Sequence, residues 1–409
     1  MQARSQVCDA QTAPVGRAAA SASAGAVVIG GAYGSLALAR SLGRRGIPVW
    51  FFNSGHPIAR FSRYVRRSLA WPAGVSDQIQ CLLETGERNQ LRGWTLFPGG
   101  DQEAELLARH HSTLADFFRL TTPVWEVMRW ANDKRMTYRL AANLGIPYPW
   151  TYYPAGREDV ATLEGPFPMI LKPAITAPRN AFTQAKAWRV NSSRELLERY
   201  DQACSLVSPG RIILQELIPG SGDRQLSYAA LWGENGPVAS LVAKRLRQYP
   251  IDFGYTSTFV ESVEEPEVSC AAERLLKAIG YTGLVEIEFK YDTRVGRYKL
   301  LDVNGRAWNW HGLGRRAGID FPYLAWLQSR NEPLPEARAR AGVRWMHFSR
   351  DVVAAMLEMR EGRLSPRAYL RSLRGPAELA VFALDDPLPA LFDIPLQLRS
   401  LWRRRRSRT

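Results

Sequence analysis

The chain has 409 residues, of which 46% are hydrophobic and 11% aromatic, and its formal net charge is +15. This composition is typical of two or three packed globular domains and excludes a disordered chain. Four scattered cysteines without a CxxC pair favour a reducing compartment, so we expect a cytoplasmic protein without a zinc site. Five histidines without HExxH, and the absence of any Ser-His-Asp-like set, argue against metallopeptidases and serine hydrolases.

Residues 1–24 are rich in alanine and serine, and we predict a disordered leader there. The uncharged stretch 18–39 has the composition of a signal-peptide core, but its glycines fit a strand, a turn and a helix better. We find no apolar run long enough to span a membrane.

Residues 26–53, AVVIGGAYGSLALARSLGRRGIPVWFFN, read as strand, glycine turn, helix and strand. This order predicts the opening of a doubly wound α/β domain. The turn also allows an alternative function, a nicotinamide-dependent oxidoreductase. Against it, the second strand ends in Asn53, Ser54 and Gly55, where an acidic residue would bind the ribose.

A helix is predicted after Asn132 or Asp133, either of which can cap it, and Gly145 ends it. Lys134 then lies in the first turn, where free N–H groups and the helix dipole favour an anion. An ordinary exposed lysine is the simpler alternative.

Three further strands carry polar residues at or near their ends. FPMILKPA, residues 167–174, includes Lys172, whose ammonium needs an anion if the strand is buried. RIILQELIPG, residues 211–220, places Gln215 and Glu216 before a Pro-Gly turn. YAALWGENGPVASLVAKRL predicts a hairpin that turns at residues 234–236, and basic side chains cluster after it: Lys244, Arg245 and Arg247.

The most regular pattern is the hairpin LVEIEFKYDTRVGRYKLLDVN. With its turn centred on Val295, Glu288 stands opposite Asp302. Opposed carboxylates repel, with Cβ atoms about 5 Å apart, unless a divalent cation such as Mg²⁺ lies between them. A shifted register, or pairing with Lys290 or Lys299, remains the alternative.

Five motifs follow one another in a fixed order: DK at 133–134, ILKP ending at Pro173, QELIPG at 215–220, EIEFK at 286–290 and DVNGR at 302–306. Over roughly residues 26–330, this order resembles the ATP-grasp superfamily, and most of all its predicted ATP-dependent carboxylate–amine ligases.

The resemblance implies an α/β fold of the α+β ATP-grasp type and a division of the chain. A Rossmann-like pre-ATP-grasp domain would span 25–120 and a two-lobed ATP-grasp domain 121–330. Within the latter, the lid would cover about 148–210 and the metal-binding lobe about 211–330. A helical C-terminal segment with a basic tail would span 331–409.

The implied activity is an ATP-dependent ligase that uses Mg²⁺, with Mn²⁺ as an alternative. A small-molecule carboxylate would attack the γ-phosphate to form an acyl phosphate. An amine, or less often a thiol, would then displace phosphate and leave an amide and ADP. Nucleic acid is not an expected partner.

Site residues follow from the resemblance by position. The ATP-binding residues would be Lys134, Lys172, Gln215, Glu216, Leu217, Ile218 and Asp223. The metal ligands would be Glu288, Asp302 and Asn304, and Arg306 with Lys172 would stabilise the transferring phosphoryl group. The substrate would meet Lys244, Arg245, Arg247 and Trp310.

Three features depart from the pattern or stand outside it. Asp302 replaces the more usual glutamate, and the loop after Lys172 lacks glycines, so we expect Thr176 and Arg179 to contact phosphate instead. The terminal stretch LWRRRRSRT is either a solvated basic tail, which is the simpler interpretation, or a site of weak contact with anionic membranes. A peripheral-membrane or scaffold protein with a vestigial ATP-grasp fold is therefore a further alternative.

Overall fold

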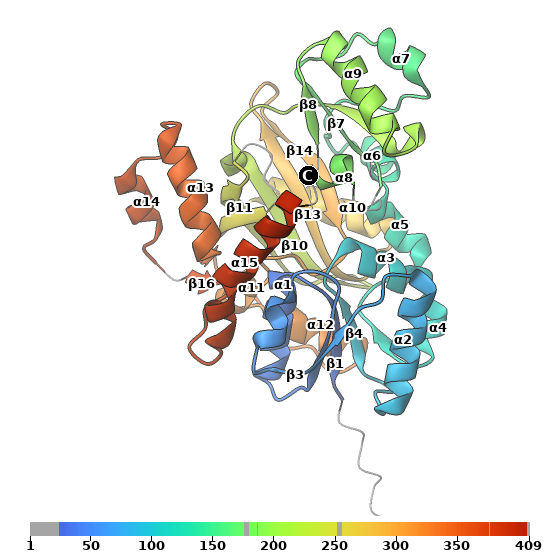
Figure 1. Ribbon diagram of the computed structural model, residues 1–409, viewed down its shortest axis with the longest axis vertical. Coiled ribbons are helices and arrows are strands. Elements are labelled where there is room, and N and C mark those ends of the chain that lie inside the picture. The colour runs from blue at the N-terminus through green and yellow to red at the C-terminus, as the bar shows by residue number, and fades with distance from the viewer. Residues whose placement is uncertain (1–23, 176–179, 186, 252–255, 376, 407–409) are drawn as a thin grey trace, which may run out of the picture.

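The computed structural model describes residues 24–175, 180–185, 187–251, 256–375 and 377–406, shown in colour in Figure 1. The predicted leader, except Ala24, lies outside these residues, and so do Thr176 and Arg179. None of the described helices has the length and hydropathy needed to cross a membrane. The described cysteines, Cys81, Cys204 and Cys270, carry free thiols.

The N-terminal part is a five-stranded parallel sheet with the order β3-β2-β1-β4-β5, as predicted for a doubly wound domain. The central strand β1 is buried along its whole length, which explains its continuous apolar sequence. The strands are β1 (Ala26–Gly30), β2 (Val49–Asn53), β3 (Val65–Ala70), β4 (Thr95–Pro98) and β5 (Arg119–Leu120). The helices are α1 (Tyr33–Gly43), η1 (Pro57–Phe61), α2 (Val75–Arg88), α3 (Asp101–Arg109) and α4 (His111–Ala115).

Two helices, α5 (Trp125–Asn132) and α6 (Lys134–Asn143), connect this domain to the rest of the chain. The Asp133 side chain caps α6 by accepting a hydrogen bond from the Arg135 backbone N–H at 2.9 Å. The predicted cap and the position of Lys134 in the first turn are therefore confirmed.

A small lobe at the top of Figure 1 has its own antiparallel sheet, in the order β6-β9-β7-β8, and its own apolar core. We call it the lid lobe. Its strands are β6 (Thr151–Tyr152), β7 (Met169–Pro173), β8 (Trp188–Val190) and β9 (Ile212–Glu216). Its helices are α7 (Arg157–Ala161), α8 (Ala181–Gln184), α9 (Ser193–Cys204) and η2 (Pro209–Arg211).

The largest sheet has seven strands in the order β14-β13-β10-β11-β12-β15-β16. It contains both predicted hairpins, and Glu288 pairs with Asp302 as the sequence predicted. Its elements are η3 (Gly222–Arg224), β10 (Gln225–Gly233), β11 (Gly236–Tyr249), β12 (Thr256–Val263), α10 (Pro266–Ile279), β13 (Gly283–Asp292), β14 (Arg297–Asn304), α11 (Gly312–Ala317), α12 (Phe321–Ser329), β15 (Arg344–Met346) and β16 (Ala377–Leu379).

The C-terminal segment is mainly helical, with α13 (Phe348–Arg360), α14 (Pro366–Ser372) and α15 (Leu388–Arg406). It also supplies β15 and β16 to the edge of the large sheet, which the sequence reading did not include. In Figure 1, α15 lies beside the N-terminal domain, and its early turns pack on η1.

The two faces of the large sheet are covered by different helices. Val285 and Ile287 of β13 join an apolar cluster with residues of α5, α6 and α10. Ala229 and Leu284 face the opposite cluster, which includes residues of α1, α11 and α12. Because side chains alternate along a strand, Glu286 and Glu288 lie on this second face. The acidic residues of the hairpin therefore face the N-terminal domain.

Candidate active site

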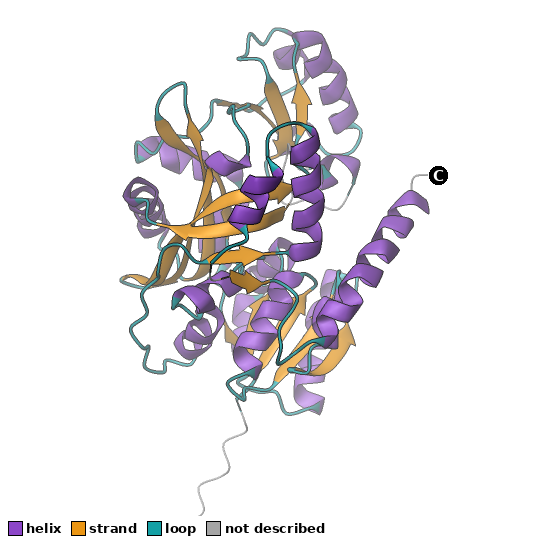
Figure 2. Ribbon diagram, turned by 90° about the vertical axis from the view of Figure 1, so that its left-hand side faces the viewer, coloured by secondary structure: helices purple, strands orange, loops and turns teal. Residues whose placement is uncertain are grey.

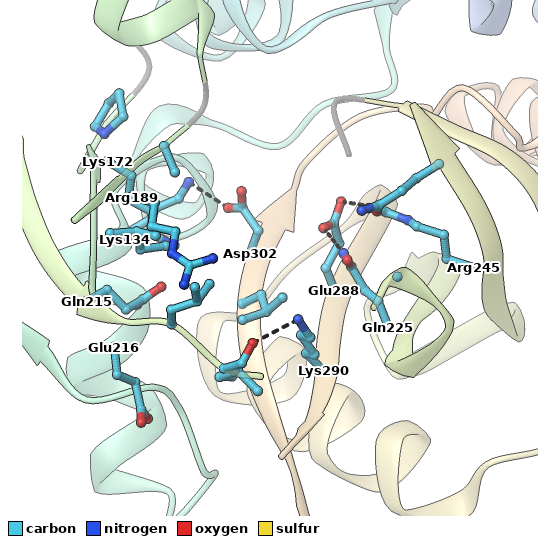
Figure 3. Close-up of a pocket in the computed structure, with 18 of the residues that line it drawn as sticks. Lys134, Lys172, Arg189, Gln215, Glu216, Gln225, Arg245, Glu288, Lys290 and Asp302 are labelled. Atoms are coloured by element: carbon cyan, nitrogen blue, oxygen red, sulfur yellow. Dashed lines mark hydrogen bonds and ion pairs between the residues drawn. The ribbon is translucent and has the colours of Figure 1, made fainter. Parts of the chain in front are cut away.

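A cavity of about 910 Å³ lies between the lid lobe, the large sheet and the start of α3. Figure 3 shows that lysines and an arginine of α6 and the lid lobe approach from one side, and carboxylates of β13 and β14 from the other. Of the predicted residues, the cavity is lined by Lys134, Lys172, Gln215, Glu216, Leu217, Ile218, Arg245, Glu288 and Asp302.

Lys134 and Asp302 form an ion pair inside the cavity. The Lys134 Nζ atom lies 2.7 Å from Asp302 Oδ1, and both side chains are largely shielded from solvent. Burial alone lowers the pKa of Lys134, but the Asp302 carboxylate outweighs it, and the pKa is raised overall. Lys134 is therefore a permanent cation at this wall.

Lys172 lies at the end of β7, in the lid lobe. Its Nζ donates a hydrogen bond to the Tyr138 hydroxyl at 3.1 Å. Arg189 of β8 also lines the cavity. Three cationic side chains from α6 and the lid lobe thus converge on one region, which fits a polyanion such as a nucleotide phosphate chain.

The segment from Gln215 to Ile218 joins the lid lobe to the large sheet, and we call it the hinge segment. Gln215 Nε2 donates a hydrogen bond to the Thr151 hydroxyl oxygen at 2.9 Å. The Leu217 N–H donates to the Pro168 carbonyl, and the Ile218 carbonyl accepts from Lys290 Nζ at 2.9 Å. Burial and the nearby Arg245 lower the pKa of Lys290 to about 8. The hinge segment is therefore held on both sides.

Glu216 anchors the hinge segment to the β13–β14 hairpin. Its carboxylate contacts Lys299 Nζ at 2.5 Å and Arg294 Nη2 at 2.6 Å. Both cations also bind Asp292, which is fully buried. Burial raises the pKa of Glu216, but the two cations outweigh it and lower the pKa overall. This four-residue set, Glu216, Asp292, Arg294 and Lys299, is the hinge network.

Four polar residues form a patch on one face of β13 and β14, since Glu286 pairs with Asn304 and Glu288 with Asp302. Glu288 accepts a hydrogen bond from Gln225 Nε2 at 2.5 Å, and Arg245 Nη2 lies 3.6 Å away. Burial and the neighbouring Glu288 raise the pKa of Glu286 to about 7. Among the described residues, no group of three or more His, Cys, Asp or Glu side chains is arranged to hold a metal by itself.

Other predicted residues lie next to the cavity or away from it. Arg306 is held by Asp101 at 2.7 Å, and Asp101 lines the cavity while Arg306 does not. Asn304 donates to Glu286 Oε2 at 3.2 Å behind the cavity wall. Asp223 is exposed and does not line the cavity, but it accepts a hydrogen bond from the hydroxyl of Ser221, which does.

The predicted substrate residues are separated by the structure. Of the four predicted substrate residues, Lys244, Arg245, Arg247 and Trp310, only Arg245 lines the cavity. Arg247 forms a buried ion pair with Asp351 at 2.8 Å, and Lys244 stands across from Glu261 on the neighbouring strand. Trp310 is buried and donates from Nε1 to Glu286 at 3.0 Å, so direct contact of Trp310 or Arg247 with a ligand requires rearrangement.

Sequence reasoning missed several lining residues. Arg189, Gln225 and Lys290 line the cavity, as does the start of α3 from Gly100 to Glu103. These carry no local motif, because their place in the site depends on how three separate parts of the chain pack. Sequence reasoning also missed Glu286, which does not line the cavity but lies beside Glu288 on the same face of β13, and its alternation with apolar neighbours in EIEFK was the available signal.

The glycine turn after β1 has a packing role in this fold. A Cβ atom at Gly31 would lie 2.6 Å from the Gly55 nitrogen, and the Gly31 carbonyl accepts a hydrogen bond from the His56 N–H. At Gly30, φ is +142°, and a Cβ would lie 2.9 Å from Gly99 Cα. The close approach of three chain segments explains these glycines without a nicotinamide cofactor.

Comparison with known proteins supports the architecture, although no family model matches the chain. The chain is 24% identical over 226 residues to D-aspartate ligase of Enterococcus faecium, and the match spans 52% of the chain and 53% of that enzyme. It thus spans about half the length of this relative.

Solved structures show the same fold. An L-amino acid ligase from Bacillus licheniformis superposes with a TM-score of 0.59 and 14% identity, covering 76% of this chain and 75% of that one. The biotin carboxylase domain of Hydrogenobacter thermophilus 2-oxoglutarate carboxylase, solved with MgADP and bicarbonate, gives a TM-score of 0.62 at 14% identity, covering 78% and 73%. These likenesses show that the chain has the ATP-grasp fold that the ordered motifs predicted, with a Rossmann-like domain in front of the ATP-grasp domain.

Proposed function

We propose that this protein is an ATP- and Mg²⁺-dependent ligase that joins a small-molecule carboxylate to an amine and releases ADP and phosphate. The observation that carries the proposal is the opposition of charges across the cavity. Lys134, Lys172 and Arg189 line one side, and Glu288 and Asp302 line the other. The relatives named D-aspartate ligase and L-amino acid ligase support amide-bond formation as the reaction class.

ATP would lie with its adenine at the hinge segment and its phosphates toward Lys134 and Lys172. The apolar side chains of Leu217 and Ile218 line the cavity there and suit a flat base. Asp223, hydrogen-bonded to Ser221 of the cavity wall, would accept a ribose hydroxyl. Asp302 is the ion-pair partner of Lys134 in this structure. An incoming phosphate would replace Asp302 as the partner of Lys134 and release this carboxylate.

The acidic patch fits a magnesium ion that is shared with the nucleotide. Mg²⁺ is usually bound by one or two carboxylates together with substrate phosphates, and a complete protein cage is not needed. Glu288 and Asp302 supply two such carboxylates on the cavity wall, and Asn304 stands behind them. When bound, the ion would neutralise charge that develops on the transferring phosphoryl group.

The remaining roles follow from charge and position. Phosphoryl transfer depends on positioning and charge neutralisation, so this site needs no protein nucleophile. Lys172 would balance charge on the γ-phosphate as the substrate carboxylate attacks it. Arg245 lines the cavity beside Glu288 and is the best placed of the predicted basic residues to orient that carboxylate. Arg306 would act through Asp101, which it holds at the cavity edge.

The reaction class can be tested by trapping the acyl phosphate. Purified protein, Mg²⁺-ATP and candidate amino acids would be incubated with hydroxylamine, which converts an acyl phosphate to a hydroxamate. We expect hydroxamate and ADP in equal amounts, both lost in Lys172→Ala. The exposed Lys277→Ala of α10 is the matched control and should retain both. ADP release without any hydroxamate or amide product, across both D- and L-amino acids, would contradict the proposal.

A further inference from the structure

Helix α15 exposes an apolar face along its outer side. Leu391, Ile394, Leu398 and Trp402 are 69%, 58%, 62% and 56% exposed. Their spacings of three, four and four residues place them in one stripe of an α-helix. We call these four residues the α15 stripe. Figure 2 shows α15 along the outer side of the molecule, with its C-terminal turns standing clear of the other elements.

The opposite face of α15 is fixed to the protein. Asp393 is 5% exposed and accepts hydrogen bonds from the Tyr33 and Ser349 hydroxyls, both at 2.9 Å. Gln397, one turn later, donates to Asp393 and to Ser349. A surface helix normally buries its apolar face and exposes its polar one. In α15 the inner side combines these polar contacts with apolar ones, since Ala390 and Leu396 pack on the core and Phe392 stacks on Phe61. The α15 stripe is thus a second apolar face, which remains exposed.

The same part of α15 is strongly basic. From Ile394 to Arg406 the helix contains no acidic residue and five arginines, Arg399 and Arg403 to Arg406. Cations at the C-terminal end of a helix are also favoured by the helix dipole. A continuous apolar stripe thus leads into a cationic end, with Trp402 at the boundary.

We propose that the α15 stripe binds the surface of an anionic lipid bilayer. The apolar side chains would enter the boundary between headgroups and acyl chains, where tryptophan is favoured, and the arginines would contact acidic headgroups. Charge complementarity favours an anionic bilayer, because acidic headgroups match the five arginines of this segment, whereas the same segment of a second copy carries no acidic residue to pair with them. This inference is independent of the proposed ligase activity.

The test is flotation of the full chain with lipid vesicles. We expect binding to vesicles made of equal parts phosphatidylcholine and phosphatidylserine, and little binding to pure phosphatidylcholine. The stripe variant Leu391→Glu/Ile394→Glu/Leu398→Glu should lower the partition coefficient at least roughly tenfold. A charge-matched control, Val75→Glu/Val295→Glu/Leu370→Glu, changes three exposed apolar residues outside α15 and should bind like the parent.

A second variant tests the charge separately. Replacing Arg403 to Arg406 by glutamine should also weaken binding to the anionic vesicles, with unchanged far-ultraviolet circular dichroism. The proposal is overturned if the parent does not float, or if the stripe variant floats as well as the control. It is also overturned if light scattering shows a parent dimer that the stripe variant converts to monomer without any flotation, since the face would then bind a second copy.

Discussion

At the scale of single residues, the ion pair between Lys134 and Asp302 would most directly couple nucleotide to metal in the proposed reaction. Each residue is the other's counter-ion at 2.7 Å. A phosphate that binds Lys134 would therefore also free a ligand for Mg²⁺. Such an exchange would let the nucleotide and Mg²⁺ bind in a fixed order, because neither Lys134 nor Asp302 would be left without a counter-ion in a low-dielectric site.

Asp302→Asn should raise the Mg²⁺ requirement of the reaction. An amide is a weaker ligand for a hard cation than a carboxylate, so at limiting Mg²⁺ we expect kcat/KM to fall by roughly tenfold or more. Excess Mg²⁺ should restore part of the loss. The control is Asp77→Asn, an exposed aspartate of α2. Full turnover of Asp302→Asn at limiting Mg²⁺ would remove Asp302 from the metal site.

Glu286→Gln should stabilise the protein at high pH. The pKa of Glu286 in the fold is about 7, above its ordinary value of 4.5, so folding favours the protonated form. The stability that the protonated Glu286 carboxyl contributes is complete below pH 4.5 and is lost as the pH rises through 7. We expect Glu286→Gln to be more stable than the parent by roughly 2–3 kcal/mol at pH 8.

The measurement for Glu286→Gln is urea unfolding at pH 5 and pH 8. The difference between the two proteins should shrink to about 1 kcal/mol at pH 5, where the folded parent carboxyl is mostly protonated. Glu267→Gln, an exposed position at the start of α10, should change stability little at either pH. An equal advantage of Glu286→Gln at both pH values would show that ionisation is not the cause.

At the scale of secondary-structure elements, the hinge network ties the lid lobe to the β13–β14 hairpin. Arg294 and Lys299 hold the pKa of the buried Asp292 well below its usual range and bind Glu216 of β9 at the same time. The position of the lid lobe therefore depends on contacts at the cavity wall, where Glu216 and Arg294 line the cavity, and on Asp292 and Lys299 behind them.

Lys299→Met should leave Asp292 and Glu216 with one cation for two carboxylates. Removal of one member of a buried ionic network costs about 3 kcal/mol, so we expect that loss of unfolding free energy and a several-fold rise in the KM for ATP. Urea titration and initial rates measure the two effects, with Lys277→Met as the control. A stable variant with unchanged KM would show that the network does not position the hinge segment.

The hairpin is also where the sequence was most informative. Strict alternation indicated which residues of the hairpin share a face, and the predicted pairing of Glu288 with Asp302 is confirmed. Asp133 as the helix cap was predictable for the same reason, since a cap is a local contact.

The predicted turn centre on Val295 is wrong, because Asp292 pairs with Arg297. A β-bulge restores the predicted register only for Glu288 and the two residues before it. The β-bulge between Glu288 and Phe289 could not be predicted, because alternation alone does not reveal an extra residue in the opposite strand.

At the scale of the whole molecule, the ordered motifs predicted the ATP-grasp fold, but the partners of charged residues could not be predicted. Lys134 and Asp302 are 168 positions apart, and Arg247 and Asp351 are 104 apart. Such pairs form only when distant parts of the chain pack together. The sequence therefore suggested a substrate-binding role for Arg247, because it could not reveal the buried partner Asp351. The orientation of α15 depends in the same way on Tyr33, which is 360 positions from Asp393.

Binding of ATP between the two lobes is tested most directly by thermal unfolding with and without Mg²⁺-ATP. At a hundredfold excess over Kd, a ligand stabilises the native state by about 2.7 kcal/mol, so we expect a rise in Tm of at least about 3 °C. Lys172→Ala should lose this rise, and Lys277→Ala should keep it. Unchanged Tm values for the parent protein, or an equal rise in Lys172→Ala, would contradict an ATP site at this cavity.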